Sequence, residues 1–354
     1  MTLLSNATAS SLPENKAVVS SASSIERHCR QYSGASDWRS LLQLTLTLIL
    51  FLATFSLAYF VMPYSYAASW PFIVIAAGLL TKLFIIQHDC GHGSFFVSKT
   101  GNTWLGRALS LLTATPYDFW RRAHNVHHAS SGDLDRRSIG GIDTITVREY
   151  KALTKRMQLA YRIYRNPVIL IFLGTPFYTI FAQRIPVNVP MHFYDNYKTL
   201  SAESIYASIM MTNVALFLFY CALGYVLGFW TLVMLCLPIL VLTTWIGGWL
   251  FYVQHQFEDA YWQHHEDWSA KESALMGSSY YKLPKILQWF TGSIGLHHIH
   301  HLCPGIPNYK LQECMDARPE LAEINRLSFL DSLKCLHLKL WDEDRQKLVR
   351  FGDL

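Results

Sequence analysis

The chain has 354 residues, of which 51% are hydrophobic and only 16% are charged. Because soluble domains carry about 25% charged residues, this composition excludes an ordinary soluble enzyme and is typical of a membrane protein. The net charge of +5 is modest and requires no nucleic-acid partner. Seven cysteines, an odd number without a Cys-x-x-Cys pair, indicate reduced thiols and not a disulfide framework.

The first 38 residues are rich in Ser and Ala, and they lack the basic start and apolar core of a secretory signal. We therefore expect residues 1–38 to form a flexible cytoplasmic N-terminal tail, with an organelle transit peptide as the alternative. Residues 39–354 then form one membrane domain.

Four apolar stretches are about as long as the roughly 20 residues that a helix needs to cross a bilayer. They predict transmembrane helices at residues 41–62, 70–88, 205–225 and 230–254. The second stretch contains one charge, Lys82, whose long stem is expected to reach the headgroups. The polar or amphipathic remainder, 93–204 and 257–354, predicts a cytoplasmic helical cap. Two semi-apolar patches in the cap, 105–116 and 167–182, are expected to lie in the membrane interface.

The distribution of Lys and Arg predicts the orientation of these helices. None lies between the first and second helices or between the third and fourth, whereas fourteen lie in 93–204 and eleven in 257–354. By the positive-inside rule, both termini and the middle region face the cytoplasm. The sequence thus predicts an all-α integral membrane protein whose second and fourth helices end at the same membrane face.

Three histidine clusters are expected at the membrane face where the second and fourth helices end. They are His88-Asp89-Cys90-Gly91-His92, His124-Asn125-Val126-His127-His128 and His297-His298-Ile299-His300-His301. Residues three and four apart share one face of a helix, so each cluster directs two or three imidazoles the same way. His255, at the end of the fourth helix, emerges on the same side. The topology therefore predicts that the clusters meet in one metal centre.

The number of imidazoles indicates which metal this centre holds. Catalytic zinc sites use about three protein ligands, so eight or nine histidines exceed the needs of one zinc. They suit two ions with open positions, and imidazole is a good ligand for iron. Two irons beside a membrane indicate O₂ activation on a lipid-like substrate. Carboxylates near the clusters in sequence are expected to receive the outer imidazole N–H groups, namely Asp89, Asp133, Asp135, Glu258 and Asp259.

In order and spacing, the three clusters resemble the histidine boxes of the membrane fatty acid desaturases. Four flanking stretches are similar too, and they favour the bacterial acyl-lipid branch: 132–137, 249–258, 277–284 and 307–309. The resemblance covers about residues 40–345. It implies a di-iron enzyme that uses O₂ and two electrons to remove two hydrogens from adjacent methylenes of a membrane lipid acyl chain, leaving a cis double bond.

The resemblance also implies which residues bind the metals. The ligands would be His88, His92, His124, His127, His128, His297, His300, His301 and, outside the boxes, His255. His298 is off the spacing and is expected to face a partner outside the metal shell. The bacterial branch implies an inner-membrane location.

Substrate contact is expected near the end of the fourth helix. Residues within two turns of His255 are Trp245, Gly247, Gly248, Trp249 and Tyr252. Paired glycines would let an acyl chain pass close to the backbone, or would serve ordinary helix packing through small residues. A set of arginines either forms a solvated basic face or docks lipid phosphates or an acidic electron donor: Arg121, Arg122, Arg136 and Arg137.

The electrons must come from outside the chain. The sequence contains no fused His-Pro-Gly-Gly haem-binding segment and no cysteine spacing for an iron–sulfur cluster. We therefore expect a ferredoxin-like or flavodoxin-like donor.

Three other functions fit parts of the pattern. A membrane di-iron hydroxylase or monooxygenase on a lipid-like substrate uses the same oxidant and differs in its product. A histidine-rich metal transporter is disfavoured, because it requires polar ligands near the bilayer midplane. A membrane zinc hydrolase is disfavoured, because the ligand count is about twice what it needs.

Overall fold

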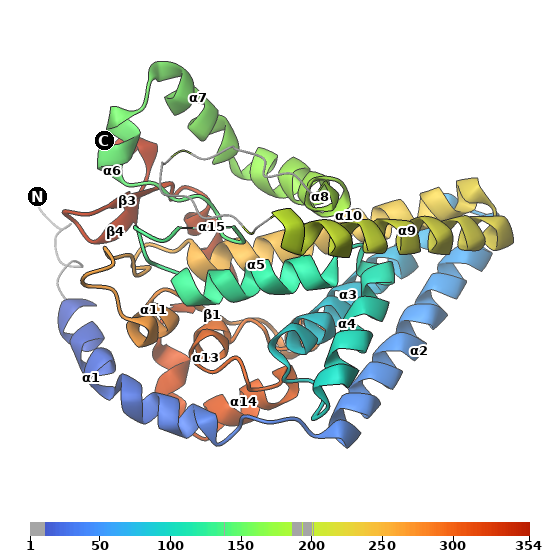
Figure 1. The fold of residues 1–354 in the computed structure, drawn as a ribbon, viewed down its shortest axis with the longest axis horizontal. Helices are drawn as coiled ribbons and strands as arrows, with labels where there is room; N and C mark the ends of the chain where they lie inside the picture. The colour runs from blue at the N-terminus through green and yellow to red at the C-terminus, as the bar shows by residue number, and fades with distance from the viewer. Residues whose placement is uncertain (1–10, 138, 186–192, 194–199, 201) are drawn as a thin grey trace, which may run out of the picture.

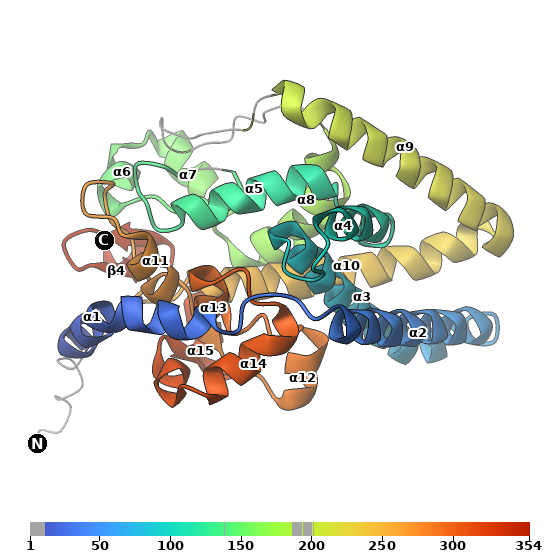
Figure 2. The ribbon, with the colours of Figure 1, turned by 60° about the horizontal axis from the view of Figure 1, so that its bottom comes forward.

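Four long helices form one end of the molecule, and short elements gather at the other end (Figures 1 and 2). The structure is a computed structural model that describes residues 11–137, 139–185, 193, 200 and 202–354. The long helices are α2 (Asp37–Val61), α3 (Tyr66–His92), α9 (Ala202–Leu227) and α10 (Phe229–His255). Each is long and apolar enough to cross a membrane, and the four helices correspond to the four predicted spans, whose crossing of a membrane stays a prediction.

The central helix of this bundle is α3, which packs against α2, α4 and α10. Its most apolar stretch is 61% buried, compared with 17% for the corresponding stretch of α2. The Ser65 hydroxyl caps its start by accepting the Ala68 N–H at 3.2 Å. Gly93, in the left-handed region at φ 69°, ends it directly after His92. The helix therefore continues for one turn beyond the predicted end at residue 88, and this turn carries both histidines of the first cluster.

The other elements form the predicted helical cap. Its helices are α4 (Lys99–Thr113), α5 (Tyr117–Ser130), α6 (Val147–Ala152), α7 (Lys155–Tyr164), α8 (Thr175–Ile180), α11 (Ala270–Met276), α12 (Lys285–Phe290), α13 (His297–Leu302), α14 (Asn308–Asp316) and α15 (Phe329–Cys335). Shorter helical turns are η1 (Val168–Gly174, a π-helix), η2 (Ala182–Arg184), η3 (Pro319–Glu323) and η4 (Phe351–Asp353). Two small sheets pair β1 (Tyr280–Tyr281) with β2 (Arg326–Leu327) in parallel, and β3 (Leu340–Asp342) with β4 (Lys347–Val349) in antiparallel fashion.

The two patches predicted to lie in the membrane interface are both helical. Residues 105–116 fall largely in α4, and residues 167–182 fall in η1, α8 and the start of η2. Together with α7, the second patch forms a pair of helical segments bent by 62°, which is apolar enough for a broken span or a re-entrant loop. The interfacial location of both patches stays a prediction.

The N-terminal segment departs from the predicted flexible tail. Helix α1 (Ser11–Arg30) lies along the outer side of α13 and α14 (Figure 1). Ala22, Ile25 and Cys29 are buried in the same core as the apolar side chains of α13 and α14. Their spacing of three and four residues makes one apolar stripe, which the Ser-rich composition of the segment conceals. The prediction of a tail over residues 1–38 is therefore wrong from residue 21 onward, and residues 1–10 lie outside the described part of the chain.

The expectation for Lys82 is also wrong. Its side chain is only 4% exposed, and its ammonium group lies against Trp289 of α12 and does not extend to the surface. The cap covers the half of α3 that ends at His92, so Lys82, which the sequence suggests is a surface anchor, is largely buried.

Candidate metal centre

Four segments bring nine histidines to one place, where the long helices meet the cap. These segments are the ends of α3 and α10 and the short helices α5 and α13. The nine are the predicted ligands, and they divide into two groups. The five-histidine group is His88, His92, His124, His128 and His300, and the four-histidine group is His127, His255, His297 and His301. Within each group, one ring nitrogen of every residue lies within 4.8 Å of the others.

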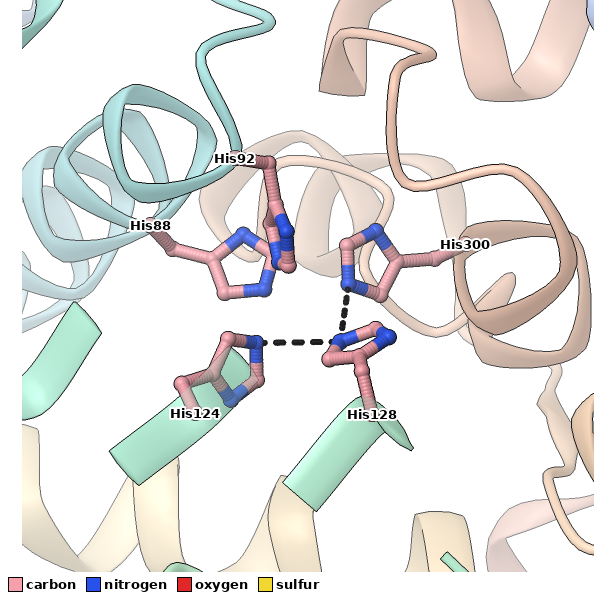
Figure 3. Close-up of side chains that lie close together, drawn as sticks. All are labelled: His88, His92, His124, His128 and His300. Atoms are coloured by element: carbon pink, nitrogen blue, oxygen red, sulfur yellow. Dashed lines mark hydrogen bonds between the residues drawn. The ribbon is translucent and has the colours of Figure 1, made fainter. Parts of the chain in front are cut away.

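The five imidazoles of the first group point toward one another from three segments (Figure 3). Nε2 of His128 lies 3.1 Å from Nε2 of His124 and 3.2 Å from Nε2 of His300. The Nε2 atoms of His88 and His92 are buried and have no hydrogen-bond partner among the described residues. All five rings thus direct a lone pair, or a nitrogen that can carry one, at a common point.

The four-histidine group has the same arrangement around His255 of α10. Its Nε2 lies 3.1 Å from Nε2 of His127 and 3.0 Å from Nε2 of His297. Nε2 of His301 is buried and has no hydrogen-bond partner in the described part of the chain. The two groups are adjacent, because the ring of His301 stacks on that of His128 with centroids 4.0 Å apart.

These separations fit metal ions. A histidine nitrogen lies about 2.1 Å from a bound transition metal, so two ligands at a right angle are about 3 Å apart. The four Nε2···Nε2 separations, 3.0 to 3.2 Å, match that value. Because two facing ring nitrogens share at most one hydrogen, a cluster of nine imidazoles, seven buried and two half-buried, leaves several acceptors unsatisfied unless cations occupy it.

Burial keeps the cap histidines neutral. Desolvation, and after it repulsion among neighbouring imidazoles, lowers the pKa well below the ordinary histidine value for all six: His124, His127, His128, His297, His300 and His301. Neutral imidazole is the form that ligates a metal. The site is therefore prepared for ligation at physiological pH without a proton having to leave it.

Two hydrogen bonds fix the orientation of particular rings. Nδ1 of His88 lies 3.2 Å from Oδ1 of Asp89, whose Oδ2 accepts from the backbone N–H and side-chain amide of Asn308 at 2.7 and 2.8 Å. Nδ1 of His255 lies 3.1 Å from the Gly277 carbonyl oxygen. With Nδ1 as the donor in each case, Nε2 is left as the metal-facing acceptor.

The model of the family described as fatty acid desaturase matches residues 64–330, which is more than half of the chain. The chain belongs to the fatty acid desaturase family. A protein named fatty acid desaturase from Bacillus subtilis is 41% identical over 312 residues, covering 88% of this chain and 86% of that protein. The sn-1 acyl-lipid omega-3 desaturase (ferredoxin) of Synechocystis sp. is 29% identical over 275 residues, covering 75% and 72%. The acyl-lipid omega-3 desaturase (cytochrome b5) of Arabidopsis thaliana, named for the endoplasmic reticulum, is 29% identical over 255 residues, covering 70% and 63%.

Of the carboxylates expected around this desaturase centre, only Asp89 contacts one of the nine histidines in the described structure. Asp133 pairs with Arg136 and with His265, whose Nδ1 lies 2.9 Å from it. Asp135 lies 3.1 Å from Nδ1 of His264. For these two residues the prediction is wrong, because the loop after α5 carries them outward to a different pair of histidines.

Glu258 and Asp259 are likewise not part of the desaturase centre. Both are exposed, and Glu258 pairs with Lys347 of β4 at 2.9 Å. His298 is buried, and its Nε2 lies 3.0 Å from the Leu321 carbonyl oxygen, so it contacts backbone outside both groups.

The residues predicted to line the substrate path differ in their surroundings, since some face open space and others are closely packed. A Cβ on Gly248 would lie 2.4 Å from Cγ2 of Thr175 in α8, whereas a Cβ on Gly247 would meet nothing within 4 Å. Gly248 therefore serves close packing of α8 on α10, the alternative reading of the glycine pair. Tyr252 is fully buried with its hydroxyl 3.2 Å from the Cys335 carbonyl oxygen, and its place along the substrate path stays a prediction.

The two tryptophans of this set form hydrogen bonds to neighbouring elements. Trp245 donates its indole N–H to the Phe172 carbonyl oxygen at 3.0 Å. Trp249 donates to the Tyr281 hydroxyl at 3.2 Å. Both thus attach α10 to cap elements.

Three residues beside the centre were missed by sequence reasoning. Trp120 stacks on the His124 ring with centroids 4.6 Å apart, and Phe251 lies 5.3 Å from His127 and 5.4 Å from His255. Their positions four residues before His124 and His255 place them on the same helix faces, which is a signal that the sequence did contain. Asn308, by contrast, reaches Asp89 across 219 positions, and spacing gives no indication of that contact.

Proposed function

We propose that the nine histidines hold two irons and that this desaturase introduces a cis double bond into the acyl chains of membrane lipids. The convergence of five and four buried ring nitrogens on two adjacent points is the observation that carries the proposal. Acyl-lipid substrates are named for the Synechocystis and Arabidopsis relatives, which supports a lipid-linked chain over a free fatty acid.

The five-histidine group would bind one iron and the four-histidine group the other. When bound, the pair supplies the activation of O₂ and the removal of two hydrogens from adjacent methylenes. The lower ligand count of the second group leaves more open positions there. A small cavity of about 40 Å³ reaches His127 and His255 of that group, and it is the size of one or two water molecules.

The chain's own residues hold the ligands in place and restrict water. Asp89, clamped by two Asn308 donors, keeps the N–H of His88 on Nδ1. The rings of Trp120 and Phe251 cover His124 and His127 with apolar surface. The residues around the ligands are thus held in fixed positions and exclude water. In such a reaction the protein contributes largely by positioning two unreactive methylenes.

The electron donor in this proposal is a separate one-electron protein of the ferredoxin or flavodoxin class. The Synechocystis relative is named with ferredoxin and the Arabidopsis relative with cytochrome b5, so an external donor is common to both. The distribution of Lys and Arg supports placing both termini and the cap in the cytoplasm of a bacterial inner membrane.

Expression in a host with simple saturated and monounsaturated lipids tests the proposal. We expect new cis double bonds in lipid-linked acyl chains, located by mass spectrometry, and two irons per purified chain by elemental analysis. A hydroxylated product would instead identify a monooxygenase. Zinc in place of iron, with hydrolysed lipid as the product, would contradict the proposal, and so would metal lost on simple dialysis, which is the behaviour of a transporter.

A further inference from the structure

A second site of interest is an open cavity of about 300 Å³ lined by residues of α2, α3, α12 and α14 and by the turn after α12. This volume is at the lower end of the range of ligand pockets, about 300 to 1,000 Å³. Its polar lining includes Gln43, Lys82 and Asn308, and its apolar lining includes Leu42 and Leu46 of α2. None of its lining residues belongs to the two histidine groups.

The ammonium of Lys82 is the only charge in this lining without an acidic partner among the described residues. It is 4% exposed, donates one hydrogen bond to the Trp289 carbonyl oxygen at 2.8 Å, and lies 3.5 Å from the centre of the Trp289 ring. An ammonium carries three donors, so two remain for a ligand. Burying a cation without a countercharge is costly, which indicates that an anion belongs beside it.

Several other cations in the described part of the fold have partners within the chain, either a carboxylate or, for the buried Arg165 and Lys339, backbone carbonyl oxygens. Arg137 pairs with Glu149, with a nitrogen–oxygen distance of 2.8 Å. Arg165 donates to the carbonyl oxygens of Asp143 and Leu338 at 3.0 and 3.3 Å, among other acceptors. Arg39, which also lines the cavity, pairs with Glu313 at 2.7 Å. Lys82 differs from Arg137, Arg165 and Lys339 because it lines this cavity, and it differs from Arg39 because it has no carboxylate partner among the described residues.

The rim of the cavity indicates what presents the anion. On α2, Leu42 and Leu46 are 55% and 46% exposed, on a helix apolar enough to span a membrane. On α12, Ile286 is 67% exposed and Leu287 is 48% exposed. Apolar surface around a buried cation suits an amphiphile whose anionic group enters the cavity and whose chains lie along α2 and α12.

We propose that this cavity binds the phosphate group of a membrane phospholipid, with Lys82 as its countercharge. The phosphate oxygens accept the two remaining Lys82 donors, forming charge-assisted hydrogen bonds. Inorganic phosphate has the same chemistry, but it gains nothing from the exposed leucine and isoleucine side chains. The inference goes beyond the proposed function, because binding requires neither iron nor turnover.

The cavity is also connected to the metal centre. Asn308 lines it and donates to Asp89, and Asp89 lies 3.2 Å from Nδ1 of His88. A lipid held there is thus two hydrogen-bonded residues away from an iron ligand. This places the headgroup of a bound lipid beside the centre that acts on acyl chains.

Titration of the delipidated full-length chain in detergent with phosphatidylglycerol tests the proposal. Native mass spectrometry gives the bound lipid, and thermal unfolding gives the stabilisation. Wild-type protein should bind, and its Tm should rise with lipid concentration. Lys82→Met should bind at least tenfold more weakly, while its Tm without lipid stays equal to or above that of wild type. The matched control Lys285→Met removes an exposed charge from α12 and should bind as wild type does.

Two further ligands separate the sources of the anion. Diacylglycerol with the same acyl chains lacks the phosphate and should bind the wild-type protein at least tenfold more weakly than phosphatidylglycerol. Millimolar inorganic phosphate should not displace the phospholipid. Equal binding of diacylglycerol, unchanged binding by Lys82→Met, or displacement by inorganic phosphate would each overturn the assignment to a phospholipid. The wild-type comparison stands even if Lys82→Met fails to fold.

Discussion

Two sets of histidines in this protein have opposite surroundings. The nine histidines of the metal centre are enclosed, and only one of them, His88, has a carboxylate partner among the described residues. His264 and His265 lie half exposed on the cap, where Asp135 and Asp133 hold their Nδ1 atoms. The hydrogen bond to Asp135 raises the pKa of His264, whereas burial lowers the pKa of the cap ligands such as His124.

This difference in surroundings separates the candidate metal ligands from the two surface histidines. The candidate ligands in the cap lose water and gain imidazole neighbours, which lowers their pKa values and favours the neutral form. His264 of the surface set gains the carboxylate of Asp135, which raises its pKa and favours its protonated form. Histidine content by itself does not distinguish the two sets, and three of the four predictions below bear on them directly.

Removing one ligand from each group has the largest expected effect. His127→Ala and His300→Ala should each lower double-bond formation by more than about 100-fold. Each substitution deletes a proposed metal ligand, and that loss should exceed the roughly 10- to 100-fold effect of losing a residue that only hydrogen-bonds to a ligand. His264→Ala is the matched control and should retain wild-type activity. Lipid analysis of expressing cells measures the product, and membrane fractionation checks insertion. Activity in either ligand variant would count heavily against the assignment.

Asp89→Asn should have the next largest effect. Replacing the carboxylate weakens the contact to Nδ1 of His88 and disturbs the clamp from Asn308, so iron affinity should fall by about 10- to 100-fold. Competition with an iron chelator measures it. Asp135→Asn, which alters a carboxylate on the surface set, should leave iron affinity unchanged. Equal effects of the two substitutions would show that Asp89 has no special connection to the metal.

The glycine pair on α10 predicts a smaller, structural effect. Gly248→Ala places a methyl group 2.4 Å from Thr175 and should destabilise the protein by about 1 to 3 kcal/mol through overpacking. Gly247→Ala meets open space and should be neutral or stabilising by up to about 1 kcal/mol, because alanine is the better helix former. Thermal unfolding in detergent compares them. A stable Gly248→Ala would mean that α8 does not pack closely on α10.

The smallest expected effect is a pH dependence at His264. Its pKa in the folded state is raised, so its contribution to stability is complete below the unfolded-state pKa, near 6.5, and is lost as pH rises through the folded value. Because the side chain is half exposed, the contribution should stay below about 1 kcal/mol. His264→Gln should therefore lower Tm slightly at pH 6 and not at pH 8.5. A larger difference at the higher pH would reverse the sign and contradict the contact.

Much of the fold and of the ligand set could be predicted from the sequence. The four spans follow from apolar runs, and helical spacing together with the side on which each span ends predicts that the histidine clusters meet, while the resemblance to the family names the nine ligands. Both are local signals. Both predictions depend only on the periodicity of a helix and on the side of the membrane at which each helix ends.

What could not be predicted depends on contacts between distant segments. Asp133 and Asp135 follow His128 closely in sequence, but the end of α5 turns them toward His265 and His264. Asn308 reaches Asp89 only because α14 packs on α3. The burial of Lys82 likewise depends on α12, which lies more than two hundred residues later. Distance along the sequence does not predict which side chains are in contact where the cap folds back over the helix bundle.

X-ray absorption at the iron edge of the purified, iron-loaded full-length chain tests the central claim most directly. The account predicts two irons per chain with a shell of imidazole nitrogens at about 2.1 Å and no sulfur ligand. His127→Ala and His300→Ala should each lose nitrogen from that shell, and His264→Ala should leave it intact. A shell containing sulfur, or a spectrum that neither ligand substitution changes, would contradict the assignment of the metals to these nine histidines.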